Sequence, residues 1–113
     1  MGISITETEM KAIQELYAMI KDEFRVTDMM LFGSKARGDA DEYSDVDLLV
    51  LTKKPKTKSD REKLSDITSE INIDYGVGIS CIYFNVLDWE SGDDVNPLLK
   101  ENIVREGIAV NVS

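Results

Sequence analysis

The sequence predicts an α/β (α+β) protein in which a mixed sheet is flanked by helices. Segments with helical spacing of apolar residues alternate with short apolar runs, in the order α-β-α-β-α-β-α-β. One expected strand, over residues 46–51, is apolar almost throughout, as in a strand that is buried on both faces. The 113 residues contain no internal repeat and no low-complexity linker, so we expect a single domain over residues 1–113.

The first helix is predicted from a capping box, in which Thr6 and Glu9 each satisfy a backbone N–H of the other. Ile5 and Met10 can form a hydrophobic staple around it. Apolar residues then follow helical spacing at Met10, Ile13, Tyr17, Ile20 and Phe24. A strand over residues 26–32, a short helix over 35–38 and the strand over 46–51 are expected next.

A second capping box, formed by Ser59 and Glu62, is expected to begin the long helix. One face of this helix carries Leu64, Ile67 and Ile71, and a strand over residues 77–84 follows it. The last helix is predicted to begin with Asn96 as its cap and Pro97 at its first position. Gly107 then ends it before a final strand over 108–112.

Two acidic residues stand at the entrance of the apolar strand, in the stretch GSKARGDADEYSDVD over residues 33–47. Side chains alternate across a strand, so Asp45 and Asp47 project from one face with their Cα atoms about 6–7 Å apart. Such carboxylates repel unless a cation lies between them, and Mg²⁺ is commonly shared between carboxylates and substrate phosphates. The alternative is a solvated strand entrance, but Asp47 already lies inside the apolar run, where an unpaired carboxylate is costly.

The Gly-Ser pair at the start of this stretch is expected to form a phosphate-binding turn. Gly33 allows a sharp turn and close approach of a ligand, and Ser34 is placed to cap the short helix, whose free N–H groups attract anions. Lys35 and Arg37 add positive charge. Taken by itself, the Gly33-Ser34 pair would be interpreted as a plain turn, and Arg37 as a surface charge. Together with the two aspartates they indicate in-line attack on a nucleoside triphosphate.

The pattern Gly33-Ser34, ten residues, Asp45-Val46-Asp47 resembles the signature of the DNA polymerase β-like nucleotidyltransferase superfamily. The small size is similar to that of its minimal nucleotidyltransferases (MNT), some of which are antitoxins of HEPN-domain toxins. The resemblance implies the nucleotidyltransferase fold, ATP or another NTP as substrate, Mg²⁺ on Asp45 and Asp47, and phosphates held by Gly33 and Ser34 with help from Arg37. It also implies transfer of AMP to an acceptor hydroxyl, such as a tyrosine of a HEPN-type toxin.

The chain departs from the family pattern at the third carboxylate. Active members usually carry a further acid in the strand after the long helix, but that strand reads VGISCIYF and contains none. Ser80 stands near the expected place, Asp74 precedes the strand and Asp88 follows it. Two hypotheses therefore remain open: a Mg²⁺-dependent enzyme that transfers AMP, and a weak or inactive binding protein that neutralises its partner by contact alone.

Composition limits the remaining possibilities. The net charge of −9 argues against nucleic-acid binding by the domain itself, and the absence of histidine excludes histidine-based acid–base chemistry. No apolar run is long enough to span a membrane and no signal peptide is evident, so a cytoplasmic location is expected. The lone cysteine, Cys81, is expected to be a buried thiol.

The basic residues are unevenly spread, since six of the thirteen fall between Lys53 and Lys63. We interpret this run as a solvated loop and helix start. The alternative is that Lys53, Lys54 or Lys56 faces the triphosphate or an acidic partner. Because no helical recognition domain is evident, a helical HEPN-type partner or a second copy is expected to complete the acceptor side.

Overall fold

A computed structural model describes residues 5–38, 45–54, 57–92 and 95–110. Its elements occur in the order α1 (Glu7–Ile20), β1 (Val26–Phe32), α2 (Ser34–Arg37), β2 (Val46–Thr52), α3 (Lys58–Tyr75), β3 (Ile79–Asn85), α4 (Val86–Ser91), α5 (Pro97–Glu106) and β4 (Ile108–Ala109). The predicted α/β (α+β) class is confirmed. The sequence reading missed α4, a short helix that begins directly where β3 ends, with Asn85 as its cap.

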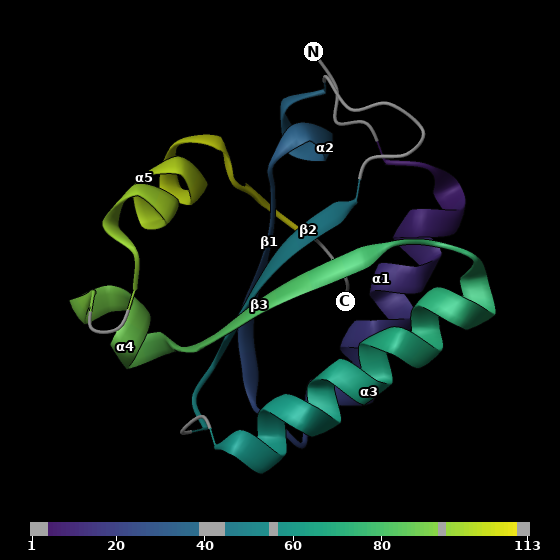
Figure 1. Ribbon diagram of the computed structural model, residues 1–113, viewed down its shortest axis with the longest axis horizontal. Coiled ribbons are helices and arrows are strands. Elements are labelled where there is room, and N and C mark those ends of the chain that lie inside the picture. Colours follow the sequence, from purple (N-terminus) through teal and green to yellow (C-terminus); the bar gives the residue numbers. More distant parts are fainter. Residues whose placement is uncertain (1–4, 39–44, 55–56, 93–94, 111–113) are drawn as a thin grey trace.

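The strands form one mixed sheet in the order β3-β2-β1-β4. β1 pairs antiparallel with β2 and with β4, whereas β2 and β3 run parallel. The parallel pair requires a long crossover, and α3 supplies it (Figure 1). As a result, the end of β1 and the starts of β2 and β3 lie at the same end of the sheet.

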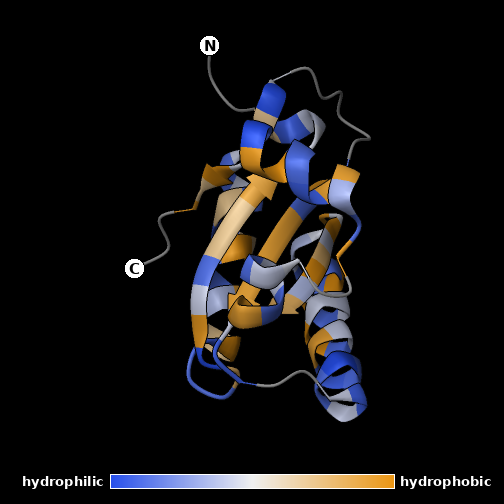
Figure 2. Cartoon of the chain, turned by 90° about the vertical axis from the view of Figure 1, so that its left-hand side faces the viewer, coloured by the Kyte–Doolittle hydropathy of each residue, from blue (hydrophilic) through white to orange (hydrophobic). Residues whose placement is uncertain are grey.

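Helices cover the two faces of the sheet unequally, and β2 shows how the sequence divides between them. Val46, Leu48 and Val50 pack in the cluster that contains the buried residues of α1 and α3. Leu49 and Leu51 pack on the opposite face with Trp89 of α4 and with α5. Figure 2 shows these hydrophobic strands enclosed between helices with more hydrophilic outer surfaces. β2 is therefore buried on both faces, as its composition predicts.

Helix and strand ends test the predicted boundaries. The Thr6–Glu9 capping box and the Asn96–Pro97 start of the last helix are confirmed. The expected Ser59–Glu62 box is wrong. The cap is Thr57, whose side chain accepts the Asp60 N–H, so α3 begins at Lys58, before the predicted cap.

The strands after α3 are shorter than predicted. Gly76, at φ +65°, ends α3, and β3 begins at Ile79 rather than at residue 77. β4 is likewise confined to Ile108–Ala109, and residues 111–112 of the expected last strand lie outside the described residues. None of the helices in the described part of the chain combines the length and apolar composition needed to cross a bilayer.

Candidate active site

The two aspartates lie at the end of the sheet where β1 ends and β2 begins. Asp47 is paired in register with Phe32 of β1 on one side and with Ser80 of β3 on the other. A Cβ atom added to Gly33 would lie 2.5 Å from Asp47 Oδ2, and one added to Gly78 would lie 3.0 Å from Asp45 Oδ1. Both carboxylates therefore occupy space that exists because glycines line it.

The electrostatics of the pair agree with the predicted repulsion. The pKa of Asp47 is raised above its usual value of 3.8, chiefly because burial removes water from the carboxylate, and secondly because the charge of Asp45 is close. The nearby Arg37 guanidinium partly opposes this rise in the pKa. Burial and the Asp45 charge thus both favour the protonated form of Asp47, and a cation between the two carboxylates would offset their repulsion.

The Gly33 turn differs from the prediction in one respect. Gly33 itself occupies the N-cap position of α2, at φ +76°, and no side-chain hydrogen bond caps the helix. Ser34 is the first helical residue rather than the cap. The Gly33 carbonyl accepts the N–H groups of Ala36 and Arg37, each at 3.1 Å, so the turn is tight. Its positive φ and the close Asp47 carboxylate both require glycine.

Substitutions in this turn are expected to weaken nucleotide binding to different degrees. Ser34→Ala should weaken MgATP binding by about 1–2 kcal/mol, the scale of one hydrogen bond to a charged group. Gly33→Val should do more, since its side chain meets Asp47 and the backbone cannot adopt the turn. Gly76→Val is the matched control, because Gly76 has φ +65° and no described atom within 4 Å of an added Cβ. Calorimetric titration should show near-normal affinity for this control, and equal losses in both glycine variants would contradict the assignment.

Lys35 has a role that the sequence did not reveal. Its side chain is buried, and its Nζ atom lies 3.3 Å from Glu9 Oε1 and 3.2 Å from Glu9 Oε2. The Glu9 carboxylate also accepts the Thr6 N–H at 2.9 Å. The expectation that Lys35 adds charge beside a phosphate is therefore wrong, because its ammonium group instead ties the turn to the start of α1.

Breaking this buried pair should cost stability. Lys35→Met leaves the Glu9 carboxylate without its cation, and removing one partner of a buried pair typically costs about 3–5 kcal/mol. Lys11→Met is the control, since the Lys11–Glu7 pair is 3.8 Å long and both side chains are largely exposed. It should cost at most about 0.5 kcal/mol. Urea unfolding measures the free energy of unfolding of both variants. Similar losses in the two would show that the buried pair stabilises the fold no more than the exposed pair does.

Arg37 is held between the carboxylates and α5. Its Nη1 atom lies 3.0 Å from Glu106 Oε2, at the end of α5. Its charge also reaches Asp47, whose pKa it lowers. Any phosphate that binds Arg37 must therefore share it with Glu106, a residue that no sequence pattern connected with the motif.

The acids near β3 answer the question of the third carboxylate only in part. Ser80 is the register partner of Asp47, as expected from the strand alignment. Asp74 is exposed in the last turn of α3, and Asp88 lies in the first turn of α4, beyond the far end of β3. Within the described ranges, no three acidic, cysteine or histidine side chains are grouped so that they could hold a metal ion.

The basic run after β2 lies away from this site. β2 begins at Val46, beside the aspartates, and ends at Thr52, so Lys53 and Lys54 follow its opposite end. Lys54 Nζ pairs with Asp60 Oδ1 at 3.1 Å. Lys56 lies outside the described residues. The alternative in which Lys53 or Lys54 faces the triphosphate is therefore wrong, whereas an acidic partner for these lysines stays a prediction.

The donor set fits magnesium. Asp45 and Asp47 supply carboxylate oxygens, and Mg²⁺ is usually bound by one or two carboxylates together with waters and substrate phosphates. At such a site, waters and substrate phosphates would supply the remaining ligands.

The Cys81 thiol is not a reactive group. Its pKa is raised to about 11 by burial, although the Thr68 hydroxyl that donates to its Sγ lowers the pKa in part. The thiol stays protonated at neutral pH.

A mixed sheet that carries a glycine turn and two carboxylates at one end is suited to holding a divalent cation together with a phosphate group. A family model described as "Nucleotidyltransferase domain" matches residues 13–110, and the chain belongs to this family.

Curated relatives point in the same direction. The chain is 51% identical over 73 residues to "Putative protein adenylyltransferase MJ1305" of Methanocaldococcus jannaschii, a match that covers 63% of this chain and 49% of the relative. It is 38% identical over 71 residues to MJ0141 of the same organism, named in the same way, covering 63% and 70%. The match to the first relative thus spans about half of that protein's length.

Solved structures confirm the fold. "Structure of putative minimal nucleotidyltransferase" matches with a TM-score of 0.60 at 29% identity, covering 93% of this chain and 97% of the other. "Crystal structure of the toxin-antitoxin with AMP-PNP" matches with a TM-score of 0.65 at 16% identity, covering 92% and 73%. A tri-AMPylated Shewanella oneidensis HEPN toxin in complex with MNT antitoxin matches with a TM-score of 0.56 at 14% identity, covering 91% and 71%. The last two similarities show the fold alone.

Proposed function

We propose that this protein transfers AMP from ATP to an acceptor hydroxyl. The observation that carries the proposal is the placement of Asp45 and Asp47 at one end of the sheet, with the Asp47 carboxylate against the Gly33 turn. Membership of the nucleotidyltransferase family supports it, as do relatives named as protein adenylyltransferases.

In this mechanism the site positions the triphosphate for in-line displacement. Gly33 and Ser34 hold the β- and γ-phosphates, and Arg37 assists. Asp45 and Asp47 would hold Mg²⁺, which would supply positive charge to neutralise the phosphate oxygens. The acceptor oxygen forms a bond to the α-phosphorus while the bond to the bridging oxygen of the β-phosphate breaks. Pyrophosphate leaves, and the hydroxyl proton passes to water, because Ser80 offers no carboxylate at that place.

The acceptor is proposed to be a tyrosine of a helical HEPN-type partner. Solved complexes of this fold include an AMPylated HEPN toxin with its MNT antitoxin. A second copy of this chain is the alternative that would complete the acceptor side.

One observation favours a second candidate function, a contact-only antitoxin. β3 presents a serine opposite Asp47, and its seven residues include no acid that could accept the proton of the acceptor. A protein that neutralises its partner by binding would need the fold, but it would not need a general base to accept the proton of an acceptor hydroxyl.

The experiment that separates the two uses α-labelled ATP, Mg²⁺ and the protein encoded beside this chain's gene. Label that appears in a tyrosine of the partner, and that is lost with EDTA, supports the transferase. A partner that binds tightly, loses its activity and stays unlabelled would instead identify the contact-only protein.

A further inference from the structure

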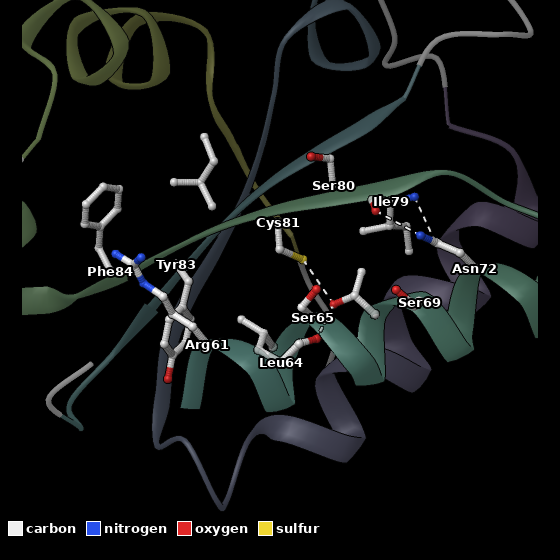
Figure 3. Close-up of a pocket in the computed structure, with 12 residues that line it drawn as sticks. Arg61, Leu64, Ser65, Ser69, Asn72, Ile79, Ser80, Cys81, Tyr83 and Phe84 are labelled. Atoms are coloured by element: carbon white, nitrogen blue, oxygen red, sulfur yellow. Dashed lines mark hydrogen bonds between the residues drawn. The ribbon is translucent and has the colours of Figure 1, made fainter. Parts of the chain in front are cut away.

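A groove of about 560 Å³ follows the outer edge of β3, between this strand and α3 (Figure 3). β3 is the terminal strand of the sheet, so no further strand among the described residues pairs with this edge. An edge strand presents backbone groups that suit a further extended chain. The backbone groups along this groove are therefore suited to binding a further extended strand.

Hydrogen bonds show which backbone groups face the groove. The Gly78 carbonyl accepts the Val46 N–H at 2.8 Å, so the backbone of Gly78, and of every second residue after it, faces β2. Ile79 faces the other way, and the Asn72 side chain brackets it, accepting its N–H at 2.8 Å and donating to its carbonyl at 3.1 Å. The Asn72 side-chain amide thus makes the two hydrogen bonds that a residue of a neighbouring strand would make. Cys81, two residues further, directs its backbone to the same edge.

The wall opposite this edge leaves room for an extended segment. Ser65 and Ser69 are exposed, short side chains on the α3 surface that lines the groove (Figure 3). Of the described residues that line the groove, the charged one is Arg61, near Tyr83 and Phe84. A net charge of −9 opposes pairing with a second copy. The groove instead suits an extended segment of another protein that carries an acidic residue.

Ser80 lies both on the strand that lines the groove and beside the candidate active site, because it is the register partner of Asp47. Its side chain points away from α3, opposite to that of Cys81, and so lies on the sheet face of its register partner Asp47 (Figure 3). A residue added opposite Ser80 on a new strand would lie two strand spacings from Asp47, or about 10 Å. A tyrosine phenol extends further from its backbone than a serine hydroxyl does, so it covers more of that distance when it leans over β3.

We propose that the acceptor binds as an extended segment that adds a strand to β3, with its tyrosine opposite Ser80 and an acidic residue near Arg61. This inference rests on the proposed function and names the form in which the acceptor enters. Because Asn72 occupies the outward backbone groups of Ile79, the added strand pairs with Cys81 and Tyr83, whose backbone groups face the same edge.

The test uses a synthetic peptide with tyrosine at its centre, threonine and valine on either side, and an aspartate at each end. Peptide binding is followed by the amide chemical shifts of the isotope-labelled protein, and MgATP binding by calorimetry. Ser65→Tyr fills the groove. Ser59→Tyr is the matched control, since Ser59 is exposed on the same helix and does not line the groove.

We expect amide shifts centred on Cys81 and Tyr83. Peptide affinity should be at least about tenfold weaker in Ser65→Tyr and unchanged in Ser59→Tyr. MgATP affinity should be the same in all three proteins. A peptide with phenylalanine for tyrosine should bind equally and take no label from α-labelled ATP. Binding at α4 or α5, or equal affinity in Ser65→Tyr, would overturn the inference. Peptide binding at β3 without any MgATP binding would refute the transferase and leave the strand-binding surface standing.

Discussion

Replacing Asp47 by asparagine is expected to abolish Mg²⁺-dependent ATP binding while the fold is kept. The side chain has nearly the same shape, so the packing against Gly33 survives, but one of the two anionic ligands is lost. Transfer should fall by several orders of magnitude, because metal coordination at these sites contributes most of the charge neutralisation. Calorimetric titration of MgATP measures the first effect, and label transfer measures the second.

The metal-free variant should also show a pH-dependent gain in stability. The pKa of Asp47 is raised in the folded protein, so the ionised carboxylate destabilises the fold at all pH values above that raised pKa. Asparagine removes this cost. The Asp47→Asn variant should therefore melt at a higher temperature than the wild type at neutral pH, and the difference should vanish below the usual carboxyl pKa of 3.8.

Asp28→Asn is the control for both measurements, since Asp28 is an exposed residue of β1. It should change neither the nucleotide affinity nor the pH profile of melting. Wild-type MgATP affinity in Asp47→Asn would remove the basis of the site assignment.

Local patterns in the sequence explain what could be predicted. The apolar run of β2, the Thr6–Glu9 box and the Asn96–Pro97 start each depend on residues a few positions apart, and the structure confirms them. The spacing of the motif likewise predicts that Asp45 and Asp47 share one face. The short helix α4 was missed although Asn85 caps it, because one turn and a half of helix has little apolar periodicity.

Long-range pairs explain what could not be predicted. Glu9 and Lys35 are 26 residues apart, and Arg37 and Glu106 are 69 apart. Nothing in the periodicity of either segment specifies these contacts, since they arise only when α1 and α5 pack beside the Gly33 turn. Lys35 and Arg37 therefore look equivalent in the sequence, but the fold buries the first in an ion pair and leaves the second beside Asp47.

The missing third acid leads to the second large expected effect, a gain of activity in Ser80→Asp. Ser80 and Asp47 are register partners on parallel strands and share a face of the sheet, so an aspartate here would face the two existing carboxylates. It would add an oxygen ligand and a proton acceptor beside the attacking hydroxyl. General-base assistance of this kind is worth about 10²–10⁴-fold in rate.

We hypothesise that the natural chain is slow for want of this base, and the measurement is AMP transfer to the partner at saturating MgATP. Ser80→Asn is the matched control, because it adds similar volume without a charge, and its rate should stay near that of the wild type. Ser80→Asp should also lower the melting temperature of the metal-free protein, since a third carboxylate adds repulsion, and Mg²⁺ should restore it. Asp74→Asn should have no effect, because Asp74 is exposed on α3. A fast wild type that Asp74→Asn slows would show that Asp74 supplies the base, and that Ser80 does not stand at the acid's place.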